Sequence, residues 1–195
     1  MHRFSKRIIM DYGLLWLKDI PNWKPVYGGV RGLGMPSRRP AHEWKTMQEA
    51  GIKLVIDLRD KDTMARLKRV CEQHGMNYYH YPIHTNAAEI EQMVEHFEQF
   101  CQLIDAGDFY IASSKGLHRM DIALCVYWMF YAADKGIKPP LMRGCWDESG
   151  HNIDKINRIM NALYAAFTER NGKEPMPMQL FKERKAIIAL QTQQY

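Results

Sequence analysis

Short runs of branched and aromatic residues alternate along the chain with longer segments that have a helical period. The runs predict strands at residues 26–31, 52–59, 76–81 and 109–112. Between them, the apolar period predicts helices at residues 41–50, 63–73 and 88–104. Strands that alternate with helices indicate an α/β domain whose central sheet is mainly parallel and flanked by helices.

The pattern also sets the expected extent of the domain. The 195 residues are enough for one domain with a well-buried core. We expect a single domain over residues 1–195, with its core at about residues 25–170 and a loop and helix at residues 171–195. Glycine and proline at residues 32–37 are expected to break the first strand.

Composition narrows the class of protein. The chain is 46% hydrophobic and 25% charged, and no stretch approaches the length needed to span a bilayer. Asp11 and Lys18 interrupt the N-terminal segment, which we interpret as part of the fold rather than a signal peptide. The expected location is therefore cytoplasmic.

Charge and cysteine content bear on the partners. A net charge of +5 suits an anionic ligand, but the Lys and Arg residues are scattered, so no nucleic-acid partner is expected. The four cysteines form no CxxC pair, which argues against a metal site. Cys101 and Cys125 fall within apolar helical patterns and are expected to be reduced core residues. The oligomeric state cannot be read from the sequence.

The most informative segment is a polar loop at residues 113–119. A buried strand runs into the loop, and the loop runs directly into an apolar helix at residues 122–133. This order aims backbone N–H groups and the positive end of a helix at one point. Gly116 allows close approach of an anion, and Arg119 can bind two phosphate oxygens with its planar guanidinium. The residues expected to bind phosphate are Ser113, Ser114, Lys115, Gly116, Leu117, His118 and Arg119.

A simpler interpretation of the same segment stays open. Serine, five residues and arginine with a glycine between them is a common pattern. A generic α/β domain with a turn at Gly116 and a helix-capping Ser113 or Ser114 would also produce it.

The loop and three upstream segments together resemble the protein-tyrosine-phosphatase superfamily. That family has a cysteine, five residues and an arginine, with a glycine three positions after the cysteine; Gly116 and Arg119 match, and Ser113 stands at the cysteine position. Residues 26–37, 52–59 and 79–83 resemble the family's first strand and turn, its Asp-Leu-Arg strand and the strand before its general-acid loop. The pattern Lys-Gly-x-His-Arg is most similar to compact dual-specificity phosphatases of the atypical plant and fungal type.

The resemblance implies a phosphomonoester hydrolase that needs no metal or organic cofactor. Its substrate would be phosphotyrosine or a phosphorylated inositol or lipid head group. Ser113 would occupy the nucleophile position and Arg119 would bind the phosphoryl group. Ser113 stays protonated at neutral pH, however, so the chain as it stands is expected to be inactive or to trap its substrate.

Other positions depart from the family pattern. Met120 follows Arg119, where the family has Ser or Thr. The aspartate expected as general acid is replaced by threonine, which leaves His84 as the first candidate, Asp121 as the second and Asp60 as the third. His84 also fits an ordinary loop histidine.

The sequence leaves the origin of Ser113 open. The serine is either an engineered substitution or the native residue of a natural pseudophosphatase that serves as a phosphate-recognition module. A vestigial loop on a scaffold is a weaker third possibility. Asp57 and Arg59 are expected to stabilise neighbouring loops.

Overall fold

The computed structural model describes residues 24–33, 41–59, 64–83, 90–114, 116, 118–138, 140 and 153–172. The chain's internal contacts group it into two compact units. The first unit comprises Met1–Pro82 and Gln102–Gly116, and the second comprises Ile83–Cys101 and Leu117–Tyr195. Contacts alone do not define an independently folding domain, so the single domain expected over residues 1–195 stays a prediction.

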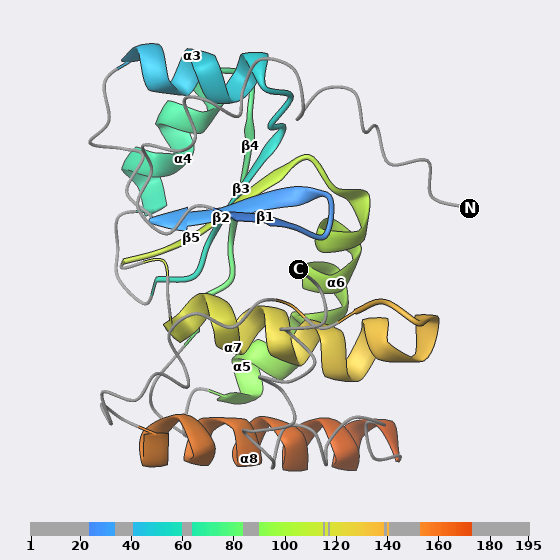
Figure 1. The fold of residues 1–195 in the computed structure, drawn as a ribbon. Helices are drawn as coiled ribbons and strands as arrows, with labels where there is room; N and C mark the ends of the chain where they lie inside the picture. The colour runs from blue at the N-terminus through green and yellow to red at the C-terminus, as the bar shows by residue number, and fades with distance from the viewer. Residues whose placement is uncertain are drawn as a thin grey trace. The chain divides into compact units, whose positions relative to one another are not determined.

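A five-stranded sheet forms the centre of the first unit (Figure 1). Its strands lie in the order β1-β2-β5-β3-β4, and every pair is parallel except β1 with β2. The mainly parallel α/β sheet expected from the sequence is therefore confirmed. The strand bounds are β1 Lys24–Val26, β2 Gly29–Leu33, β3 Leu54–Asp57, β4 Asn77–His80 and β5 Phe109–Ser113.

The sheet begins with a hairpin that the sequence pattern did not predict. The single strand expected at residues 26–31 is wrong, because β1 and β2 pair antiparallel around a turn at Tyr27 and Gly28. These two residues have φ angles of 46° and 82°, and positive φ at both central positions is typical of tight hairpin turns. A β-carbon on Gly29 would lie 2.6 Å from the Phe109 ring, so only glycine fits where β2 begins.

Helices α3 (Ala41–Glu49) and α4 (Met64–Gln73) pack against the sheet of this unit (Figure 1). Both were expected at nearly these bounds. They join the strands in one apolar cluster because each helix turns its apolar positions toward the sheet. The cluster contains Val30, Trp44, Met47, Ile52, Val55, Leu67, Cys71, Met76, Tyr110 and Ala112.

The one helix expected at residues 88–104 is instead two helices, α5 (Ile90–Glu95) and α6 (Phe97–Ala106). They meet at His96, whose N–H bonds to the Gln92 carbonyl oxygen at a long 3.4 Å. The apolar stripe continues through the interruption, which explains why its period looked like a single helix. Helix α6 passes the expected end and stops before Gly107, which has a φ of 73°.

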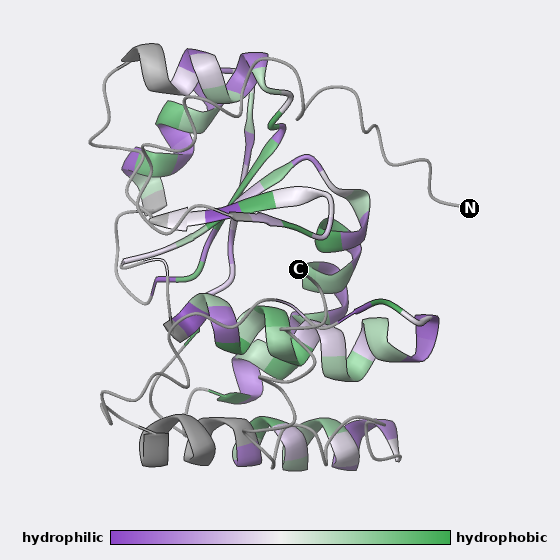
Figure 2. Ribbon diagram, viewed as in Figure 1, coloured by the Kyte–Doolittle hydropathy of each residue, from purple (hydrophilic) through white to green (hydrophobic). Residues whose placement is uncertain are grey.

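Most of the described residues of the second unit are helical. Helix α7 (His118–Tyr127) continues as a π-helical turn at Trp128–Ala132 and a 3₁₀ turn at Ala133–Lys135. Beyond its first turn α7 is mostly hydrophobic (Figure 2). Helix α8 (Ile153–Asn171) carries Phe167, whose ring centroid lies 4.3 Å from that of Phe97 and 4.4 Å from that of Phe130. The helix expected within residues 171–195 lies outside the described residues beyond residue 172.

Candidate phosphate-binding site

The loop follows β5 at the carboxyl edge of the sheet. Every residue of β5 is buried, and Ser113 at its end is 3% exposed. Ser113 pairs with Leu33 of β2, so the parallel strands end side by side. The Gly116 N–H donates to the Ser113 carbonyl oxygen (3.2 Å), and Gly116 has a φ of 68°, a conformation that favours glycine. The chain thus turns sharply directly after Ser113, as the sequence predicted.

A buried arginine that sequence reasoning did not single out contacts this turn. Arg31 lies in the middle of β2 and is 1% exposed. Its Nη2 donates to the Gly116 carbonyl oxygen at 3.4 Å. The only sequence signal was a charged residue inside an otherwise uncharged strand.

Helix α7 carries the other half of the predicted loop. It begins at His118, so Arg119 lies in its first turn and is partly buried. The N–H groups of a first turn have no partners within the helix, and they form its positive end. Lys115, Leu117 and the His118 side chain lie outside the described residues. Because the loop passes from the first unit into the second, the phosphate site as a whole stays a prediction.

The described part of the chain offers one of the three candidate general acids. His84 and Asp60 lie outside the described residues. Asp121 is 0% exposed, and its charge contributes to the raised pKa of the Cys125 thiol four residues along α7. Such burial fits a structural carboxylate better than a proton donor to substrate, and a role for Asp121 in catalysis stays a prediction.

Three cysteines are described, and all are buried free thiols: Cys71, Cys101 and Cys125. Burial, with a smaller effect from the Asp57 charge, raises the pKa of Cys71 to about 12. Burial, with the charge of Asp121, also raises the pKa of Cys125. A thiol is nucleophilic only as a thiolate, so neither residue is a substitute for a catalytic cysteine.

These raised pKa values predict that the thiols of Cys71 and Cys125 resist alkylation. At pH 8 in native buffer, we expect Cys71 and Cys125 to react with iodoacetamide at least about a hundredfold more slowly than in denaturant, because little thiolate forms. Peptide mass spectrometry of samples labelled over time measures this for each site. Rapid native labelling of either residue at full occupancy would contradict the raised pKa.

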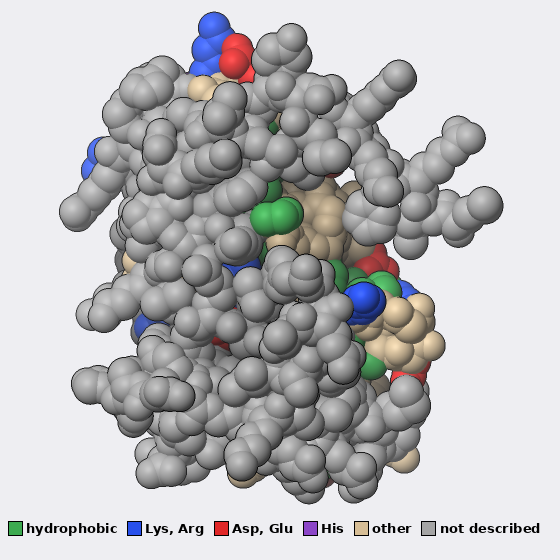
Figure 3. Space-filling view, in the orientation of Figure 1, with side chains coloured by type: hydrophobic (Ala, Val, Ile, Leu, Met, Phe, Trp, Pro, Cys, Tyr) green, Lys and Arg blue, Asp and Glu red, His purple; other side chains and the backbone are tan. Residues whose placement is uncertain are grey.

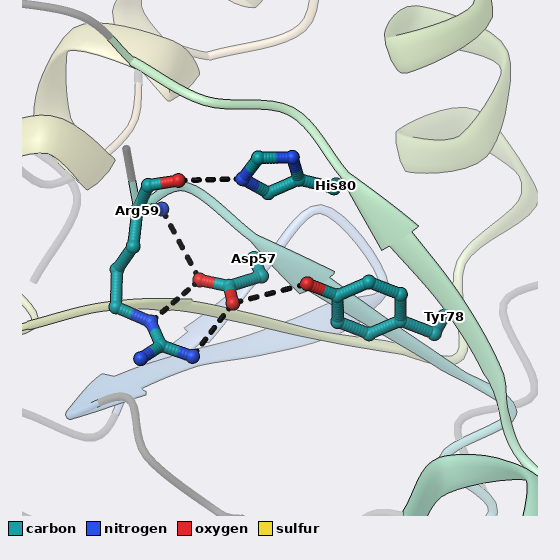
Figure 4. A network of polar contacts seen from close by, with 4 residues as sticks. All are labelled: Asp57, Arg59, Tyr78 and His80. Carbon is teal, nitrogen blue, oxygen red and sulfur yellow. Dashed lines mark hydrogen bonds and ion pairs between the residues drawn. The ribbon is translucent and has the colours of Figure 1, made fainter. Parts of the chain in front are cut away.

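A second polar cluster lies at the carboxyl ends of β3 and β4 (Figure 4). Asp57 accepts from the Arg59 guanidinium at both oxygens, with Nε to Oδ1 at 2.8 Å and Nη2 to Oδ2 at 2.7 Å. The Arg59 backbone N–H adds a third bond to Oδ1 (3.1 Å), and the Tyr78 hydroxyl donates to Oδ2 (3.2 Å). Four donors therefore surround one carboxylate that is 1% exposed.

Tyr78 and His80 complete this cluster. Burial, with the nearby Asp57 charge and the bond to it, raises the pKa of Tyr78, so its hydroxyl stays a donor well above pH 10. The His80 ring donates from Nε2 to the Arg59 carbonyl oxygen at 2.6 Å, because a carbonyl only accepts. Asp57 and Arg59 thus connect the end of β3 to β4, and their expected role in stabilising neighbouring loops stays a prediction.

Three further features of the described residues concern their charged surface, metal ligands and membrane-spanning helices. On the face shown in Figure 3, a few Lys and Arg side chains of the described residues are visible. Within the described ranges, no group of three or more His, Cys, Asp or Glu is placed to hold a metal ion. None of the described helices is both long and apolar enough to cross a bilayer.

Comparison with solved structures identifies the fold. A DUF442 protein of Shewanella putrefaciens CN-32, provisionally called a phosphatase, matches with a TM-score of 0.53 at 18% identity, over 77% of this chain and 96% of its own. A second crystal structure of a DUF442 protein from that organism gives 0.52 at 17% identity, over 80% and 97%. The chain has a phosphatase-like fold.

This confirms the predicted resemblance at the level of fold. TpbA of Pseudomonas aeruginosa matches with a TM-score of 0.43 at 14% identity, over 90% of this chain and 91% of its own, which is too low to carry weight. No family model and no curated protein matches the sequence.

Proposed function

We propose that residues 113–119 bind the phosphoryl group of a phosphate monoester, as in a phosphatase of the tyrosine-phosphatase-like kind. The observation that carries this proposal is the sharp turn between Ser113 and Gly116 directly after buried strand β5. A turn with a left-handed glycine exposes successive backbone N–H groups on its concave side, which favours an anion.

The covalent chain brings the helix close to this turn. Only one residue separates Gly116 from His118, where α7 begins, and two residues of chain span at most about 7 Å. In the proposed site the positive end of α7 serves the same anion as the turn, and Arg119 in the first helical turn supplies a guanidinium for two phosphate oxygens. The backbone and Arg119 together supply enough positive character to neutralise a phosphate without a metal.

The hydrolytic form of this site needs cysteine at position 113. Its thiolate would attack phosphorus, and the ester oxygen would leave with a proton from an acid, for which His84 ranks before Asp121. Water would then attack the phosphocysteine, releasing inorganic phosphate and restoring the thiolate. With Ser113, the hydroxyl keeps its proton, so this chain binds the ester without turning it over.

The alternative function is a phosphate-recognition module in which Ser113 is native. It is favoured by the raised pKa values of the Cys71 and Cys125 thiols, because neither residue can then replace the missing nucleophile. Both functions share one ligand class, phosphotyrosine or a phosphorylated inositol or lipid head group. Both require anion binding by the present chain.

Calorimetric titration of this chain with inorganic phosphate tests the proposal. Arg119→Ala is expected to weaken binding by about 10- to 100-fold, because it removes charge-assisted hydrogen bonds. Lys68→Ala is the matched control, since it removes one exposed cation from α4. If the folded chain binds no phosphate, or if both substitutions have the same effect, the phosphate loop is rejected.

A further inference from the structure

Arg31 is a deeply buried charged residue of the first unit. It is 1% exposed and ranks among the largest fully buried side chains of the described residues. Arginine is rarely buried to this degree unless its charge is used, because removing the guanidinium from water is costly. Its position in β2 places it beside the strand that leads to the phosphate loop.

The register of the sheet aims Arg31 toward that loop. Arg31 pairs with Ile111, and two residues further along both strands Leu33 pairs with Ser113. Because alternate residues of a strand share a face, Arg31 and Ser113 lie on the same face of the sheet. The long Arg31 side chain reaches forward past the end of β5, where Nη2 donates to the Gly116 carbonyl oxygen.

We propose that Arg31 is a positioning residue for the phosphate loop. It binds the Gly116 carbonyl oxygen and so fixes the peptide group that follows the left-handed glycine. The contact holds Gly116, and with it the turn that follows Ser113, in the conformation on which the proposed loop depends. The guanidinium also adds a buried positive charge close to the loop. This inference rests on the proposed function.

A purely structural role makes a different prediction. If Arg31 only filled the sheet interior, its replacement would lower stability and leave the anion affinity of the folded fraction unchanged. If Arg31 positions the loop, losing its contact with the Gly116 carbonyl lowers the affinity of the folded chain for phosphate. Loss of the hydrogen bond to the Gly116 carbonyl, which a carbonyl carbon chemical shift reports, is common to both roles, so the affinity for phosphate is the readout that separates them.

The test titrates inorganic phosphate into Arg31→Met, Arg31→Lys and Lys53→Met, with binding corrected for the folded fraction. Arg31→Met is expected to weaken binding at least about tenfold, and Arg31→Lys to recover part of that loss because the charge remains. Lys53→Met is expected to change affinity less than about twofold. Lys53 is a matched control because it also belongs to the first unit but pairs with Asp108, which precedes β5.

The outcomes separate the two proposals. A smaller loss in Arg31→Lys than in Arg31→Met, with a shifted Gly116 carbonyl resonance in triple-resonance NMR spectra, supports the positioning role. Unchanged affinity in folded Arg31→Met overturns that role but leaves the phosphate loop intact. If Arg31→Met does not fold, Arg31→Lys and Arg31→Gln are judged by the same affinity and resonance criteria. Failure of the unmodified chain to bind phosphate would instead reject the loop itself.

Discussion

Replacing Ser113 by cysteine is expected to produce hydrolysis of p-nitrophenyl phosphate at a rate at least about 10³-fold above that of the Ser113 chain. The reason is the state of the nucleophile. If residues 113–119 form the proposed site, the loop amides, the start of α7 and Arg119 all favour the thiolate of a cysteine at this position. A serine hydroxyl in the same place keeps its proton at neutral pH. Release of p-nitrophenolate, followed across pH, measures the gain.

Two further variants test separately the position of the thiol and the charge of Arg119. Ser114→Cys is a matched control, since it places a thiol one residue further along the same loop on an exposed residue. We expect no turnover from Ser114→Cys, because its thiol is no longer at position 113, the last residue of β5. Adding Arg119→Ala to Ser113→Cys should remove at least about a hundredfold of the gain, because the transferring phosphoryl group loses its guanidinium.

The pH profile gives an independent readout. Turnover by the Ser113→Cys protein should rise as the thiolate forms, within about pH 3.5–7.5 for an activated cysteine, and fall once the general acid loses its proton. A folded Ser113→Cys protein that binds phosphate but shows no turnover would contradict the hydrolase and favour the recognition module. Turnover by Ser114→Cys at the same rate would contradict the assignment of position 113.

The order of strands and helices followed from local patterns in the sequence. Strand β5 and helices α3 and α4 have strong periodicity and clear boundaries, so their positions were predicted closely. The hairpin at Tyr27 and Gly28 was missed because a tyrosine with positive φ is rare, and because the pattern placed the Gly28-Gly29 pair within one strand. The break at His96 has no proline or glycine to signal it.

The candidate site was predictable only where its residues are adjacent in the chain. The sharp turn from Ser113 to Gly116 could be inferred from a glycine between a buried strand and a helix. Arg31 could not, because it lies 85 residues from Gly116 and reaches it only when β2 pairs with β5. Asp57 and Arg59 were expected to stabilise neighbouring loops, whereas the structure shows their bonds to β4, which depend on strand pairing that no local pattern contains.

Replacing Arg59 by methionine is expected to lower the free energy of unfolding by about 3–5 kcal/mol. The side chains of Arg59 and Asp57 are 9% and 1% exposed, so the substitution leaves a carboxylate buried without its cation. This is a large part of the total stability of a domain, which is about 5–15 kcal/mol. Urea unfolding followed by tryptophan fluorescence measures the loss.

The loss of stability in Arg59→Met comes from the Asp57 carboxylate, which stays buried without its cation, and a second substitution tests this. In Asp57→Leu with Arg59→Met both charges are gone, and we expect the free energy of unfolding to recover to within about 1–2 kcal/mol of the unmodified chain. Lys45→Met is the control ion-pair loss: its 3.7 Å pair with Glu49 is 72% and 62% exposed, so the effect should stay under about 0.5 kcal/mol. If Arg59→Met proves as mild as Lys45→Met, the Asp57–Arg59 pair does not hold the carboxyl end of β3. If the double variant is as unstable as Arg59→Met, lost packing rather than the orphaned carboxylate is the cause.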